Sequence, residues 1–108
     1  MQANEYQQRT IETAIYPESG TGSTLELAYL GLGLASEAGE VTGKIKKLLR
    51  DGRLDTDDLV GEIGDVCWYV ARLCSAFGYD IEDVLQMNYE KLQSRKARGT
   101  LQGNGDNR

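Results

Sequence analysis

Four acidic residues in two similarly spaced pairs are the side chains of this sequence best suited to chemistry. Glu37 and Glu40 form the first pair, and Glu62 and Asp65 form the second. In a helix, residues three positions apart lie on one face, with Cβ atoms about 5–6 Å apart. Two facing helices would then supply an all-oxygen ligand set, which suits Mg²⁺, with Mn²⁺ as an alternative. The pattern predicts a carboxylate metal site between two helices.

Glu37 is the most informative of the four because of its place on the expected helix. On a helical projection it falls inside an apolar stripe, where a carboxylate is costly unless it is paired or bound to a metal. An alternative interpretation is that Lys44 and Lys47, on the same helix, neutralise Glu37 and Glu40. The stripe consists of Leu30, Leu34, Val41, Ile45 and Leu48.

Three polar residues near the end of the chain share another helical face. Asn88, Lys91 and Arg95 follow one another at helical spacing. Beside a metal site, cationic groups in this arrangement would bind phosphate. Taken without such a site, the same residues would form an ordinary basic face in solvent.

Composition removes several classes of function. The sequence has no histidine, which excludes Ser-His-Asp and Cys-His catalysis and zinc sites that use histidine. The 12 basic and 17 acidic residues give a net charge of −5, which argues against nucleic acid or an anionic membrane as a partner. Cys67 and Cys74 lie too far apart along one helix to pair, and their apolar neighbours predict buried thiols. With no signal peptide, these features predict a cytoplasmic protein.

Turn residues divide the chain into helical segments. Pro17 opens a glycine-rich loop, Asp51 and Gly52 form a turn, and Gly78 ends a third segment. No stretch alternates as a strand would, so the expected fold class is all-α. We expect one domain at residues 1–98, with helices at about 3–15, 24–49, 56–77 and 80–97, and a flexible tail at 99–108.

The long helix expected at 24–49 carries a second contact face opposite its apolar stripe. Glycine inside a helix costs about 1 kcal/mol relative to alanine, so small residues here predict close packing by another helix. One four-helix chain cannot easily cover both faces and leave a substrate groove, so we expect a homo-oligomer whose shared bundle contains the second and third helices. The small residues are Ala28, Ala35, Gly39 and Gly43.

Three segments, in this order, resemble the MazG-like nucleotide pyrophosphohydrolases of the all-α NTP-pyrophosphatase superfamily. They are residues 34–41 (LASEAGEV), 62–71 (EIGDVCWYVA) and 88–95 (NYEKLQSR), with Lys44 and Lys47 after the first. The resemblance covers about residues 24–97, and both ends of the chain also resemble compact phage and bacterial members. It implies a four-helix MazG-like bundle that is completed by dimerisation.

The resemblance also implies an activity and roles for individual residues. The reaction would be hydrolysis of a nucleoside triphosphate to the monophosphate and pyrophosphate, with Mg²⁺ held by Glu37, Glu40, Glu62 and Asp65. The partners would be the nucleotide and further copies of the chain, as a homodimer or a dimer of dimers. Phosphate-binding candidates are Lys44, Lys47, Lys91 and Arg95. Nucleotide-binding candidates are Asn88, Tyr16, Trp68 and Tyr69. The three aromatic residues would stack on the base, unless they are ordinary residues of the hydrophobic core.

The sequence leaves the substrate open. Some phage members of this kind resemble enzymes of modified-purine genome pathways, which makes a purine deoxynucleotide such as dGTP the first hypothesis. Housecleaning of aberrant nucleotides fits the motifs equally well. A non-catalytic acidic helical dimer that binds a partner protein would explain the helices and the charge, but not Glu37 inside the apolar stripe.

Overall fold

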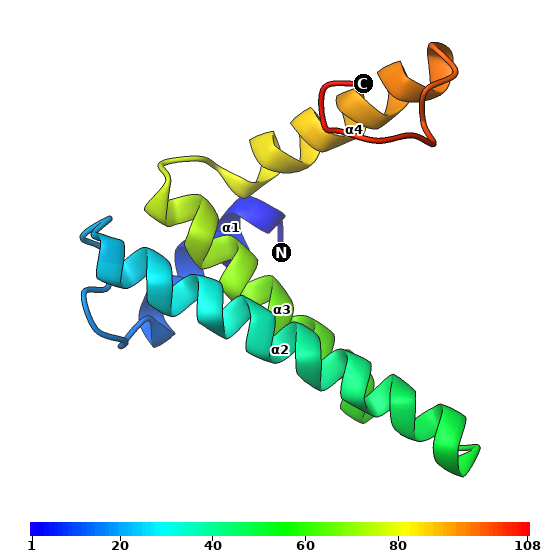
Figure 1. Ribbon diagram of the computed structural model, residues 1–108. Helices are drawn as coiled ribbons and strands as arrows, with labels where there is room; N and C mark the ends of the chain where they lie inside the picture. The colour runs from blue at the N-terminus through cyan, green and yellow to red at the C-terminus, as the bar shows by residue number, and fades with distance from the viewer.

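The computed structural model describes residues 1–108 and consists of helices and their connections. Four α-helices and one 3₁₀ helix follow one another without a strand, which confirms the expected all-α fold class (Figure 1). The elements are α1 (Ala3–Arg9), η1 (Thr10–Thr13), α2 (Thr24–Asp51), α3 (Thr56–Ala76) and α4 (Ile81–Ala97). None of these helices has both the length and the apolar character needed to cross a lipid bilayer.

Local hydrogen bonds and glycines set the ends of the helices. At the start of α2, the Ser23 hydroxyl accepts a hydrogen bond from the backbone N–H of Glu26. At its end, Gly52 takes a φ of 75°, in the left-handed region that favours glycine. The first helix, expected to reach residue 15, is α-helical only to Arg9 and then tightens into η1. There the Thr10 hydroxyl donates to a carbonyl of the preceding turn, which competes with regular helix geometry.

α2 and α3 lie side by side and pack against each other more extensively than any other two elements (Figure 1). The two helices approach very closely at Gly33, where an added Cβ would lie 2.1 Å from the ring of Tyr69. Gly39 and Gly43, which were expected to allow a close helix crossing, have no atom within 4 Å of such a Cβ. Within one chain, the close approach therefore occurs at Gly33, and the glycine face expected from the sequence stays uncovered.

The small hydrophobic core lies where α1 and α3 meet the start of α4. It consists of Ala71, Cys74 and Ile81, with partly buried side chains from α1 around them. The buried side chain of Gln7 ties the three helices together, because its amide donates to Ser75 and its carbonyl oxygen accepts from the backbone of Ile81. This junction fixes the N-terminal helix against the end of α3.

The single chain is open rather than compact. α4 projects away from the α2–α3 pair and does not contact α2 (Figure 1). The radius of gyration of 16.5 Å exceeds the roughly 13 Å expected for a compact chain of this length. Large apolar side chains such as Ile63, Phe77 and Leu85 are exposed, and Cys67, expected to be buried, is exposed as well. Cys74 is buried as expected.

The last ten residues return along α4 (Figure 1). The Arg108 guanidinium donates to the carbonyl oxygens of Thr100, Leu101 and Gly105 and closes this segment into a loop. Glycine-rich composition alone did not indicate these contacts. The tail therefore has defined polar partners on its own helix.

Candidate metal centre

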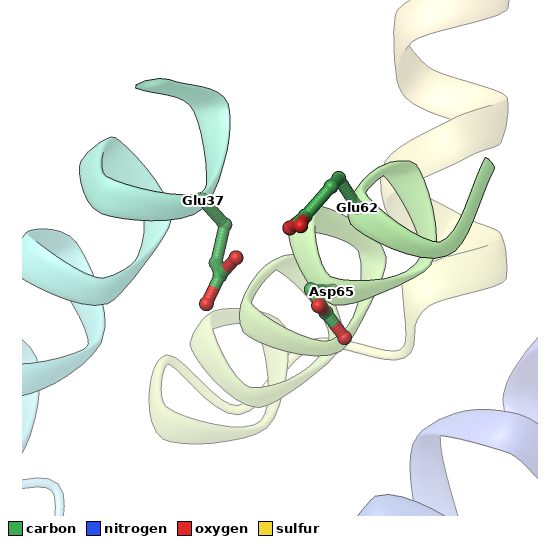
Figure 2. Close-up of side chains that lie close together, drawn as sticks. All are labelled: Glu37, Glu62 and Asp65. Carbon is green, nitrogen blue, oxygen red and sulfur yellow. The ribbon is translucent and has the colours of Figure 1, made fainter. Parts of the chain in front are cut away.

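Three carboxylates from two helices gather at the middle of the α2–α3 pair. Glu37 from α2 faces Glu62 and Asp65 from α3, and one ligand oxygen from each lies within 4.8 Å of the others (Figure 2). Glu37 and Glu62 are half-buried, whereas Asp65 is exposed. The structure thus brings together three of the four acidic residues that the sequence singled out.

The register of the two helices explains why these side chains meet. Gly33 of α2 lies against Tyr69 of α3. One helical turn further along α2 is Glu37, and one turn back along α3 is Asp65. Because the close contact at Gly33 fixes the register of the two helices, Glu37 and Asp65 are held opposite each other.

The negative charge of Glu37 is not neutralised within the chain. Burial raises the pKa of Glu37, and the negative charges of Asp65 and Glu62 raise it further. No lysine or arginine forms an ion pair with Glu37. A carboxylate whose pKa is raised by like charges is stabilised by any cation that enters the cluster.

Glu40, the fourth acidic residue, lies one turn beyond Glu37 and is exposed. Its carboxylate is not one of the three that gather. Its negative charge is nevertheless close enough to contribute to the raised pKa of Glu37. Glu40 therefore lies at the edge of the cluster.

Lys44 and Lys47 of α2 lie on the side of the cluster toward the α2–α3 turn. Lys44 Nζ is 2.5 Å from a carboxylate oxygen of Asp58 and 3.7 Å from one of Glu62. The Asp58 hydrogen bond, together with these negative charges, raises the pKa of Lys44. Lys44 and Lys47 also line an open cavity of about 450 Å³, to which Arg53 adds a third cation. Lys44 thus balances the charge of Asp58 and of one edge of the cluster, and leaves Glu37 unpaired.

The three aromatic residues proposed for base stacking lie together but contact one another. Tyr16 stacks on Tyr29 with ring centroids 5.0 Å apart, and Trp68 meets both Tyr16 and Tyr69 edge to face. The Trp68 indole N–H donates to the Thr13 hydroxyl. These rings therefore anchor η1 and the following loop to the α2–α3 pair.

Asn88, Lys91 and Arg95 lie on α4, away from the acidic cluster. Lys91 and Arg95 both form ion pairs with Asp106 of the tail. Asn88 is exposed and lines a cavity of about 430 Å³ together with Lys91 and Asp106. Because α4 does not contact α2, one chain does not bring these residues to the carboxylates.

Sequence reasoning missed a buried polar network at the start of α2. Glu26 is 1 % exposed and accepts hydrogen bonds from the Tyr16 hydroxyl and from the backbone of Gly20 and Gly22. Burial raises the pKa of Glu26, but these hydrogen bonds and the charge of Arg72 outweigh it and lower that pKa below its usual value. The signal was the spacing of Ser23 and Glu26, which is typical of a helix start.

The chemistry of the cluster fits a divalent cation. Its donors are carboxylate oxygens only, which are the ligands that Mg²⁺ and Mn²⁺ prefer. They converge from two helices, and Glu37 among them has no cationic partner. The residues that would hold such an ion are Glu37, Glu62 and Asp65, with Glu40 beside them.

Comparisons with known proteins identify the family of the chain. The family model described as the MazG nucleotide pyrophosphohydrolase domain matches residues 26–99, which contain all four acidic residues. The chain is 46% identical to the "Gene 37 protein" of Mycobacterium phage L5, over 100% of both chains. No solved structure matches significantly. The family match confirms the resemblance noted in the sequence. The chain therefore belongs to the MazG nucleotide pyrophosphohydrolases, hydrolases that act on phosphoanhydride bonds.

Proposed function

We propose that the protein hydrolyses a nucleoside triphosphate to the monophosphate and pyrophosphate with the help of Mg²⁺. The observation that carries the proposal is the convergence of Glu37, Glu62 and Asp65 from two helices in a chain of this family. MazG domains generally depend on a divalent metal ion. Mn²⁺ would fit the same oxygen ligands.

The residues around the cluster have chemically distinct tasks in this reaction. A bound divalent cation would neutralise the triphosphate and make a water molecule more acidic. One of the four acidic side chains, Glu37, Glu40, Glu62 or Asp65, would accept a proton from the attacking water at its carboxylate. Lys44 and Lys47 lie beside the cluster, where their charge would stabilise the leaving pyrophosphate.

We further propose that the working enzyme is a homodimer or a dimer of dimers, in which a second copy completes each site. Support comes from the exposed apolar side chains of α2 and α3 and from the distance between α4 and the cluster in one chain. In a dimer, Lys91 and Arg95 of one protomer would approach the phosphates bound by the partner. Mixing inactive Glu37→Gln and Arg95→Gln proteins should then restore part of the activity. Light scattering that returned a monomer of about 12 kDa at working concentration would contradict the assembly.

Release of pyrophosphate from a panel of ribo- and deoxynucleoside triphosphates, with and without Mg²⁺, tests the reaction and the substrate together. We expect a purine deoxynucleotide such as dGTP to be preferred. A preference for modified nucleotides would instead indicate housecleaning of the nucleotide pool. Absence of turnover with every nucleotide, at high protein concentration and with Mg²⁺ or Mn²⁺, would leave a non-catalytic acidic dimer. A cytoplasmic location, expected from the two unpaired cysteines, remains part of the proposal.

A further inference from the structure

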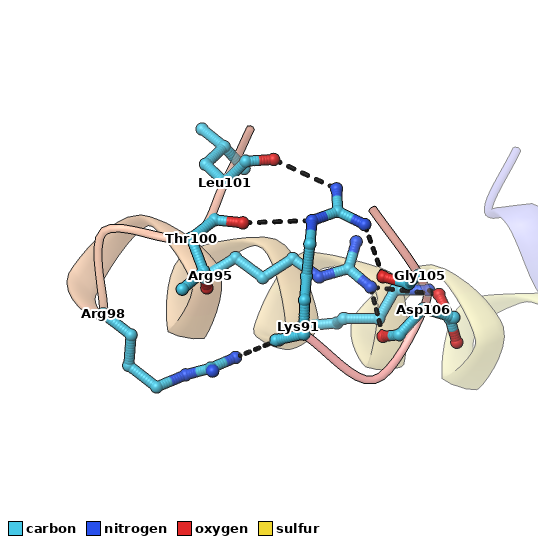
Figure 3. A network of polar contacts seen from close by, with 8 residues as sticks. Lys91, Arg95, Arg98, Thr100, Leu101, Gly105 and Asp106 are labelled. Atoms are coloured by element: carbon cyan, nitrogen blue, oxygen red, sulfur yellow. Dashed lines mark hydrogen bonds and ion pairs between the residues drawn. The ribbon is translucent and has the colours of Figure 1, made fainter. Parts of the chain in front are cut away.

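The tail of the chain lies on the cations of α4. Asp106 Oδ1 is 2.9 Å from Lys91 Nζ and 3.0 Å from Arg95 Nη2 (Figure 3). The same Arg95 nitrogen also donates to the backbone carbonyl of Asp106. Arg95 is 5 % exposed, whereas the Asp106 side chain is 76 % exposed. A buried guanidinium and a partly exposed lysine therefore share one carboxylate that remains accessible to solvent.

This site is not saturated by the carboxylate. Arg95 Nε is buried and has no hydrogen-bond partner. A phosphate group offers more acceptor oxygens and more negative charge than one carboxylate. The adjoining cavity of about 430 Å³, lined by Asn88 and Lys91, leaves room for a larger anion.

The tail is attached in a way that permits release. Arg108 closes it into a loop through three backbone carbonyl oxygens, so its shape does not depend on α4 alone. Between Lys91 and the end of the chain, the tail contacts α4 mainly through charged groups, with Leu101 43 % exposed. The Asp106 carboxylate is 76 % exposed, so water competes with both of its ion pairs even though Arg95 itself is buried.

From these observations we propose that Asp106 is a built-in competitor for a phosphate-binding site made by Lys91 and Arg95, and that a phosphate or pyrophosphate group displaces it. This inference rests on the phosphate-binding role given to Lys91 and Arg95 under the proposed function. The tail then folds onto α4 when no phosphate is bound and leaves it when the site is filled.

The test follows the tail directly, in full-length protein without a divalent metal. In ¹H–¹⁵N spectra, titration with inorganic pyrophosphate should move the Gly103 and Gly105 amide signals to random-coil positions. Asp106→Asn should bind pyrophosphate about three- to tenfold more tightly than the wild type, since it removes the competitor. Asp83→Asn, a matched change at an exposed residue of the first turn of α4, should bind like the wild type.

The outcomes separate this inference from the proposed activity. Unchanged or weaker binding by Asp106→Asn would overturn the inference and leave the tail as a structural segment or as part of the bound site. Tail signals that stay in place at saturating pyrophosphate would overturn it as well, as would absence of binding by both proteins. Release of the tail in a protein without turnover would support the inference while the proposed function failed.

Discussion

Replacing Glu37 with glutamine should stabilise the metal-free protein and remove its stabilisation by Mg²⁺. Ligand oxygens of Glu37, Glu62 and Asp65 lie within 4.8 Å of one another. Two unit charges at such a separation repel by about 1 kcal/mol in water. Because Asp65 is exposed to solvent, the value for water is the appropriate one, and loss of the Glu37 charge relieves about 1–2 kcal/mol. For a chain of this size, that raises the melting temperature by roughly 5 °C or more.

Thermal unfolding followed by circular dichroism, in EDTA and in Mg²⁺, measures both effects. The protein concentration must be fixed, because association would make the melting temperature depend on it. Glu12→Gln is a suitable control, since it makes the same chemical change at an exposed residue outside the acidic cluster. We expect the control to melt like the wild type in both buffers.

The stabilisation by Glu37→Gln should also depend on pH. Because the folded protein raises the pKa of Glu37, its ionisation opposes folding at high pH. The gain from Glu37→Gln should be full above that raised pKa and should vanish below the ordinary carboxyl value of about 4.3. A melting temperature at or below the wild type in EDTA at pH 8 would refute the argument. Equal stabilisation of both proteins by Mg²⁺ would refute it too.

Three other predictions concern packing, the buried network and the reaction. Gly33→Ala should lower the free energy of unfolding by about 2 kcal/mol, because the added Cβ would lie 2.1 Å from the Tyr69 ring. Gly31→Ala is the control, since open space surrounds that residue. Equal denaturation midpoints for the two variants would contradict the close packing at Gly33. Glu26→Gln should lower the free energy of unfolding by about 2 kcal/mol at pH 7, because it removes a buried, hydrogen-bonded carboxylate. Since folding lowers the pKa of Glu26, its ionised form contributes stability above about pH 4.3, and this contribution is lost as the pH falls through the pKa of the folded protein. Urea titrations measure the difference in free energy of unfolding between this variant and the wild type. A difference that did not shrink toward pH 3 would contradict the hydrogen-bonded network of Glu26. Hydrolysis in ¹⁸O-labelled water should place the label in the monophosphate, whereas label in pyrophosphate would indicate attack at the β-phosphorus.

The order of the helices and the placing of each acidic pair on one helix face were predictable because both depend on local patterns. Capping residues and glycines such as Gly52 act within one turn of the chain, so the start of α2 at Thr24 and of α3 at Thr56 could be anticipated. The spacing of Glu62 and Asp65 likewise places both on one face of a helix. What the sequence did not contain was the register of α2 against α3. That register depends on one tertiary contact, the ring of Tyr69 on Gly33.

The expected burial of Cys67 is wrong for the single chain, and the reason is physical. The apolar stripe of α3 predicted burial at Cys67, yet the single chain covers only part of that stripe and leaves Phe77 62 % exposed. Hydrophobic periodicity reports which face seeks burial, but not whether the same chain supplies the covering surface. The composition of the tail did not indicate its polar contacts, because the hydrogen bonds of Asp106 and Arg108 depend on the position of α4 and on the path of the chain.

The position of Trp68 makes its fluorescence a signal for the contact between η1 and α3. Trp68 is the single tryptophan of the chain, and its indole N–H donates to Thr13 of η1 at 2.8 Å. It also lies on α3 one turn beyond Asp65, with the rings of Tyr16 and Tyr69 at its edges. Its emission will shift to longer wavelength whenever η1 leaves α3 and water reaches the indole. Stopped-flow fluorescence can therefore time the docking of the N-terminal segment separately from helix formation, without any label.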